Sequence, residues 1–161
     1  MPVTANRVWR QSPIETRVSA SKIFWAESTN GRKQFIYAAL AKAKSVREIS
    51  VRRAPIERLI SWTAATLTLP EQVANELLQD YLLHEHRAVI VRYLGLLGIP
   101  HAEGMIEDGF DLASLPKERV QDAARTLLAS ADSAAAELYL KYLVVQGGPW
   151  SVIEDALPTG E

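Results

Sequence analysis

Three histidines are the residues of this chain whose chemistry first points to a site: His84, His86 and His101. Together with Glu103 they offer the imidazole and carboxylate ligands that zinc uses in proteins. Two ligands on one helix must lie three or four residues apart, whereas His84 and His86 lie two apart and would point to different sides. We therefore keep a metal site as an alternative, predict no cofactor, and interpret the histidines as polar residues at a helix junction.

Sequence motifs that carry catalysis are absent. The chain has no cysteine, which excludes thiolate nucleophiles, cysteine zinc sites and disulfides. Its eight glycines form no phosphate-binding loop, dinucleotide fingerprint or nucleophile elbow. No serine sits in a motif that specifies an adjacent histidine and acid. We therefore expect the protein not to be an enzyme.

Charge is divided unevenly along the chain. Residues 1–60 contain 12 Lys and Arg against 4 Asp and Glu, a net charge of +8, and residues 61–161 contain 6 against 15, a net charge of −9. The whole chain sums to −1, which hides the division. Such a division indicates either two surfaces that face each other or a basic segment that binds a partner.

The densest part of the basic half allows two interpretations. Its cations include Lys42, Lys44, Arg47, Arg52 and Arg53. If these side chains share a face, they could contact several phosphates of a nucleic acid, and nearby aromatic rings could stack on bases. The other interpretation is a solvated face whose counter-charges are the acids of a protein. We favour the second, because the acidic half would repel a nucleic acid.

Three tryptophans are the predicted anchors of a protein contact: Trp9, Trp25 and Trp150. We predict that residues 1–30 form an N-terminal arm and helix that lies on a neighbouring subunit, with its cations on that subunit's acidic half. Exchange of such arms would give a symmetric homodimer with two equivalent contacts. The preferred function is therefore a self-associating protein-interaction module, and nucleic-acid binding and metal binding are the alternatives.

Helical periodicity accounts for most of the chain. Ser12 and Pro13 predict the start of a helix, and Asn30 and Gly31 predict its end. Residues 32–44 then form an amphipathic pattern whose polar face is basic. Further helices are expected to begin near residues 55, 70, 88, 116, 132 and 149. No alternating strand pattern is present, so we predict an all-α fold.

One helix should be central to that fold. The run at residues 88–99 is apolar almost all round, which predicts the most buried helix, ending at Gly98. Gly95 inside it predicts a close helix contact. Residues 100–115 are predicted to form a long acidic loop. We expect a single domain in which residues 31–157 form a bundle of about seven helices.

Three sequence blocks resemble an uncharacterised group of bacterial all-helical proteins. They are ALAKAK at residues 39–44, YLGLLGIPH followed by EGMI within residues 93–106, and AELYLKYL at residues 136–143. The likeness extends from about Phe35 to Trp150. It implies a helical fold in a bacterial cytoplasm, and it implies no activity, ligand or site residue.

Hydropathy gives the last expectation. No stretch approaches the roughly 18 uninterrupted apolar residues that cross a bilayer, and the N-terminus lacks the order of a secretory signal. We therefore expect a cytoplasmic protein with no membrane partner.

Overall fold

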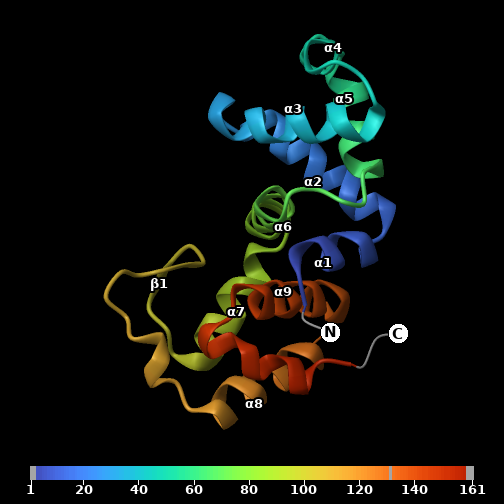
Figure 1. Cartoon of the computed structure of the whole chain (residues 1–161). Coiled ribbons are helices and arrows are strands. Elements are labelled where there is room, and N and C mark those ends of the chain that lie inside the picture. The colour runs from blue at the N-terminus through green and yellow to red at the C-terminus, as the bar shows by residue number, and fades with distance from the viewer. Residues whose placement is uncertain (1–2, 131, 159–161) are drawn as a thin grey trace. The chain divides into compact units, whose positions relative to one another are not determined.

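The computed structural model describes residues 3–130 and 132–158 (Figure 1). These residues are mostly helical, which confirms the all-α prediction. They separate into two compact units, an N-terminal unit, Thr4–Tyr81, and a C-terminal unit, Leu82–Glu161, which also takes in Val3. The predicted single bundle of about seven helices is therefore not confirmed. The charge follows the division: the N-terminal unit has 12 Lys and Arg against 7 Asp and Glu, net +5, and Leu82–Glu161 has 6 against 12, net −6.

Six helices begin in the N-terminal unit. They are α1 (Ala5–Gln11), α2 (Ile14–Glu27), α3 (Asn30–Lys44), α4 (Glu48–Arg52), α5 (Ile56–Ala65) and α6 (Glu71–Glu85). Helices α2, α5 and α6 each begin directly after a proline, as the sequence predicts, because proline fits the start of a helix and not its interior. The boundary between the units falls inside α6.

The break between α2 and α3 differs from the prediction. The sequence pattern predicts that Asn30 and Gly31 end a helix, yet both residues belong to the first turn of α3. The chain turns instead at Ser28 and Thr29, and the Thr29 hydroxyl accepts a hydrogen bond from the Arg32 N–H at 3.4 Å. Thr29 is therefore the N-cap of a new helix.

The start of α2 is also capped differently from the expectation. Ser12 is buried, and its hydroxyl donates to the Val8 carbonyl at 2.8 Å, so it closes α1 instead of capping α2. Pro13 precedes α2 without any side-chain cap. The helix begins where the sequence predicts because proline alone suffices to set the boundary.

Two buried tryptophans join the N-terminal helices to α5 and the turn after it. Helix α2 packs along α5, where Trp25 Nε1 donates to Thr63 Oγ1 at 2.9 Å. Trp9 of α1 is fully buried, and its Nε1 donates to the Thr66 carbonyl at 2.9 Å. Both indole N–H groups are therefore paired in the interior, as burial of a polar group requires.

Helix α1 is held at its N-terminus by a carboxylate 65 residues away. The Glu71 side chain accepts hydrogen bonds from the backbone N–H groups of Ala5 at 2.9 Å and Asn6 at 2.8 Å. The Asn6 side chain donates to the Leu69 carbonyl at 2.6 Å and accepts from the Leu69 N–H at 2.8 Å. Free N–H groups at a helix start favour negative charge, so Glu71 both pairs them and offsets the helix dipole.

The C-terminal unit is built on α7 and two later helices. Its elements are α7 (Arg87–Leu97), β1 (His101–Ala102), β2 (Met105–Ile106), η1 (Leu112–Ser114), α8 (Lys117–Leu128), α9 (Ser133–Gln146) and η2 (Gly148–Ala156). Helix α7 ends at Gly98, whose φ of 68° is the left-handed conformation expected of a glycine cap. Helices α7, α8 and α9 pack on one another, and η2 lies across α8 and α9.

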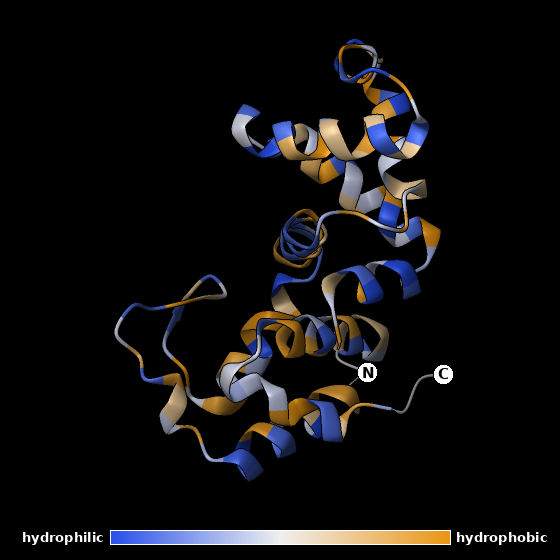
Figure 2. Ribbon diagram, viewed as in Figure 1, coloured by the Kyte–Doolittle hydropathy of each residue, from blue (hydrophilic) through white to orange (hydrophobic). Residues whose placement is uncertain are grey.

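Aromatic rings fill the centre of this unit. Tyr93 of α7 is fully buried, its hydroxyl donates to the Val120 carbonyl at 3.2 Å, and its ring meets those of Tyr139 and Trp150 at centroid distances of 5.8 and 6.1 Å. Burial raises the pKa of Tyr93 and of Tyr139 well above the ordinary value. Figure 2 shows hydrophobic positions along α9. The prediction that α7 is central to a core is therefore confirmed within its own unit.

The predicted long loop at residues 100–115 contains short regular elements. Strands β1 and β2 pair antiparallel, with His101 opposite Ile106 and Ala102 opposite Met105. Glu103 and Gly104 form the turn with φ of 52° and 90°, the signs that a two-residue hairpin requires. A Cβ atom on Gly104 would lie 3.2 Å from Ile90 Cγ2, so the hairpin also approaches α7 closely there. One continuous loop is therefore not confirmed.

We predict that Glu71→Gln lowers the free energy of unfolding by about 1–2 kcal/mol, because the charged cap on α1 is lost. The control is Glu57→Gln, which replaces the exposed first-turn acid of α5. The control should change stability by less than about 0.5 kcal/mol. Urea unfolding followed by circular dichroism compares them, and equal losses would contradict the role of Glu71.

Gly95 does not make the close contact that the sequence suggests. A Cβ atom at this exposed position of α7 would meet nothing within 4 Å. We therefore predict that Gly95→Ala raises the free energy of unfolding by about 0.5–1 kcal/mol. Gly98→Ala should instead cost about 1–2 kcal/mol, because its positive φ disfavours a side chain. Thermal unfolding of both variants tests this, and a loss at Gly95 would contradict it.

Candidate functional site

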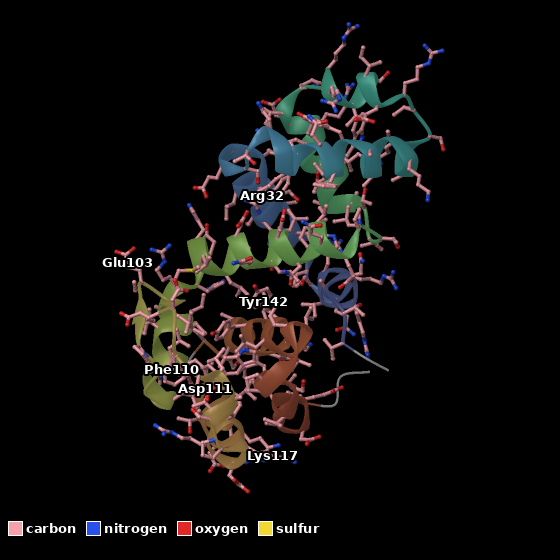
Figure 3. The ribbon with its side chains drawn as sticks, turned by 60° about the vertical axis from the view of Figure 1, so that its left-hand side comes forward. Arg32, Glu103, Phe110, Asp111, Lys117 and Tyr142 are labelled. Carbon is pink, nitrogen blue, oxygen red and sulfur yellow. The ribbon has the colours of Figure 1, made fainter. Side chains whose placement is uncertain are left out.

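Arg32 is a cation used inside the N-terminal unit. Its Nε lies 3.1 Å from a Glu76 carboxylate oxygen and its Nη2 lies 2.8 Å from an Asp80 oxygen, which ties α3 to α6 (Figure 3). The guanidinium also covers the Phe24 ring at 5.5 Å. Burial raises the pKa of Asp80 above its ordinary value, and the ion pair with Arg32 opposes that rise. Arg32 is therefore a structural residue.

Further cations lie over aromatic rings of their own unit. Arg52 Cζ lies 4.8 Å from the Tyr37 centroid, and Arg52 also pairs with Glu48 at 2.7 Å and hydrogen-bonds Gln34. Lys44 Nζ and Arg58 Cζ lie 5.9 and 5.8 Å from the Trp62 centroid. Arg52 joins α4 to the first half of α3, and Lys44 joins the end of α3 to α5. Each cation–ring contact contributes about 0.5–1 kcal/mol at an exposed site.

Three cations of the same region have no acidic counter-charge. Lys42, Arg47 and Arg53 are exposed, and no acid among the described residues forms an ion pair with any of them. All five predicted nucleic-acid residues, which are these three with Lys44 and Arg52, are exposed on α3, on α4 or beside them. The basic region therefore exposes charged side chains that an outside ligand can contact.

Large apolar side chains lie exposed among these cations. Phe35 is 58% exposed and Ile49 is 51% exposed, and Val46 and Ile56 are exposed to a similar degree. Phe35 and Lys42 are seven residues apart and share one face of α3. Ile49 and Arg53 are one helical turn apart. Apolar and charged groups therefore alternate on one part of the unit.

We call this region the cationic-apolar surface. It consists of Phe35, Lys42, Lys44, Val46, Arg47, Ile49, Arg52, Arg53, Ile56 and Arg58. Figure 2 shows hydrophobic and hydrophilic positions side by side along α3, α4 and α5. A mixed surface of this kind is typical of a site that contacts another macromolecule.

The sequence signal for this surface is incomplete. Periodicity places Phe35 on the buried stripe of α3 with Ile36 and Leu40, and only the latter two are buried. Val46 and Ile49, in the segment before α5, are exposed as well, and Val51 is buried. Helix α4 is only five residues long, and Val51 is its one buried residue.

The predicted tryptophan anchors do not lie on the surface. Trp9, Trp25 and Trp150 are at most 5% exposed, so their role as exposed partner contacts is corrected to a role in the two cores. The predicted N-terminal arm is also part of its own unit, because α1 binds Glu71 and α2 packs on α5.

The histidines do not converge. His84 lies in the last turn of α6 with its Nδ1 3.2 Å from a Glu85 oxygen, and His86 precedes α7. His101 begins β1, and its Nδ1 accepts the Gly104 N–H at 3.1 Å, which supports the hairpin turn. Across residues 3–130 and 132–158, no three His, Cys, Asp or Glu side chains are grouped as metal ligands would be.

Comparison with known proteins assigns the chain to no family. The chain matches no family model, and it has no significant similarity to a curated protein or to a solved structure. The resemblance to bacterial helical proteins therefore stays a prediction. No helix in the described part of the chain is long and apolar enough to cross a membrane.

We predict that Arg32→Gln lowers the free energy of unfolding by about 1–2 kcal/mol at neutral pH, because two carboxylates lose their cation. Folding raises the pKa of Asp80, so its ionisation opposes folding increasingly as pH rises, and Arg32 offsets that opposition. The difference between variant and wild type should therefore shrink at acid pH, as the pH falls through the raised pKa of Asp80 and that carboxylate gains a proton. Arg53→Gln, an exposed control, should change stability by less than about 0.5 kcal/mol.

Urea unfolding at the two pH values measures this difference. A loss that stays the same at acid pH would contradict the role of the carboxylates.

Proposed function

We propose that this chain acts in the cytoplasm by binding protein, and that it binds a second copy of itself through the cationic-apolar surface. The observation that carries the proposal is the combination of unpaired cations with large exposed apolar side chains, of which Arg53 and Ile49 on adjacent turns are one instance. Apolar side chains supply affinity when they are desolvated, and charges set orientation and exclude wrong partners. A purely solvated basic face would have no need of the apolar part.

A second copy is the partner that the charge distribution favours. The N-terminal unit carries a net charge of +5, and the chain from Leu82 onward carries −6. Each copy therefore offers both a basic and an acidic surface to the other. If two copies exchange these surfaces, the two contacts are equivalent and the assembly closes as a symmetric dimer.

Nucleic-acid binding is the second candidate, and Lys42, Arg47 and Arg53 favour it because phosphates could replace the missing acids. For base stacking, Trp25 is buried and Tyr37 is covered by Arg52, which leaves Phe35 as the exposed aromatic ring of the surface. A titration of labelled mixed-sequence DNA and RNA at about 50 and 200 mM salt tests it, and tight, salt-sensitive binding would promote this candidate.

We predict that the intact chain forms dimers as its concentration rises through the micromolar range typical of transient contacts, about 1–200 µM. The double variant Phe35→Ser, Ile49→Ser should weaken the dimer at least about tenfold, because two apolar anchors are removed. The matched control is Ile14→Ser on α2, which is 46% exposed and lies outside the surface. Sedimentation velocity measures all three proteins.

Two results would contradict the proposal. One is a wild-type chain that keeps its monomer mass of 17.9 kDa at every concentration. The other is an Ile14→Ser control that weakens the dimer as much as the double variant does. Because the substituted residues are exposed, the circular dichroism of each variant should equal that of the wild type.

A further inference from the structure

We propose that the partner of the cationic-apolar surface is the acidic segment at residues 103–111 of a second copy. This inference rests on the proposed function and names the part of the partner that binds. The segment has the sequence EGMIEDGFD, with four acids and no Lys or Arg. It therefore offers four negative charges within nine residues to a surface with unpaired cations.

The segment is anchored on one side and exposed on the other. Ile106 and Phe110 are half-buried and pack against the core of the C-terminal unit. Met105 is 53% exposed, and Ala102, its partner across the hairpin, is exposed with it. Since side chains opposite each other in a hairpin share a face, Ala102 and Met105 form a small apolar face that points to solvent.

The acids of the segment precede and follow Met105 along the chain. Glu103 stands at the hairpin turn, and Asp111 lies beyond it near η1 (Figure 3). Glu103 forms a weak ion pair with Arg87, because Arg87 Nη1 lies 3.3 Å from its carboxylate and both side chains are well exposed. Glu107 and Asp108 are exposed, and the described cations form no ion pair with either.

The two surfaces match in composition and in sign. Lys42, Arg47 and Arg53 lack acids on one surface, as Glu107 and Asp108 lack cations on the other. Exposed aliphatic side chains beside the cations give Met105 an apolar contact, and methionine adapts well to such surfaces. Complementary charge around an apolar centre is the usual arrangement of a specific protein contact.

Reciprocal contact gives a test by charge exchange. The cation-reversed variant is Arg47→Glu with Arg53→Glu, and the acid-reversed variant is Glu107→Lys with Asp108→Lys. Each variant alone should dimerise at least about 100-fold more weakly than the wild type, since like charges then face each other. An equimolar mixture should dimerise again, because both contacts of the mixed dimer then pair opposite charges. Sedimentation velocity with one variant fluorescently labelled measures the mixed species.

A matched control separates the segment from general charge. Glu118→Lys with Glu154→Lys makes the same change in net charge at exposed acids of the same unit, outside residues 103–111. This control should dimerise as the wild type does. A recovered mixed dimer also proves that both reversed variants are folded.

Three outcomes would overturn the inference. They are an acid-reversed variant that dimerises normally, a mixture that stays monomeric, and a control that loses as much affinity as the acid-reversed variant. If the wild type dimerises and any of these occurs, the proposed self-association survives and only the assignment of residues 103–111 fails. A wild type that is monomeric overturns both the proposed self-association and this inference. If the surface binds nucleic acid instead, the cation-reversed variant loses that binding, and adding the acid-reversed variant does not restore it.

Discussion

Helix α6 stabilises the N-terminal unit through three carboxylates, and the remaining charge distribution depends on them. Glu71 binds the free N–H groups of α1, and Glu76 and Asp80 bind Arg32 of α3. Each of these contacts joins residues more than 40 positions apart in the chain. The unit has 12 cations and 7 acids, and three of those acids form contacts inside it.

Because these acids pair inside the unit, the cations between residues 42 and 53 are left with few acidic counter-charges. Lys42, Arg47 and Arg53 have no acid among the described residues of the unit, and Lys44 and Arg58 lie over an aromatic ring instead. The apolar groups beside them are exposed, and α4 buries only Val51. The positive charge of the surface thus follows from the pairing of acids inside the unit, and acids of another molecule would supply the missing counter-charges.

The sequence predicts local structure better than it predicts burial. Pro13 and Gly98 mark helix boundaries correctly, because proline and glycine act through their own backbone geometry. Trp9 is assigned to the surface although it is fully buried, because its burial involves a contact with the Thr66 carbonyl 57 residues along the chain. Phe35 is assigned to a buried stripe although it is 58% exposed. Five of the six cations of the surface are found by composition alone, whereas the acidic segment becomes a candidate only once its hairpin exposes Met105.

Zero-length cross-linking is the most direct test of self-association through these two surfaces. A carbodiimide joins an amine to a carboxylate that touches it, and a mixture of nitrogen-15-labelled and unlabelled chains separates links between copies from links within one. Our account predicts mixed-isotope peptides that join Lys42 or Lys44 to the acids of residues 103–111. Mixed-isotope links that are absent, or that join these lysines to acids elsewhere in the chain, would contradict it.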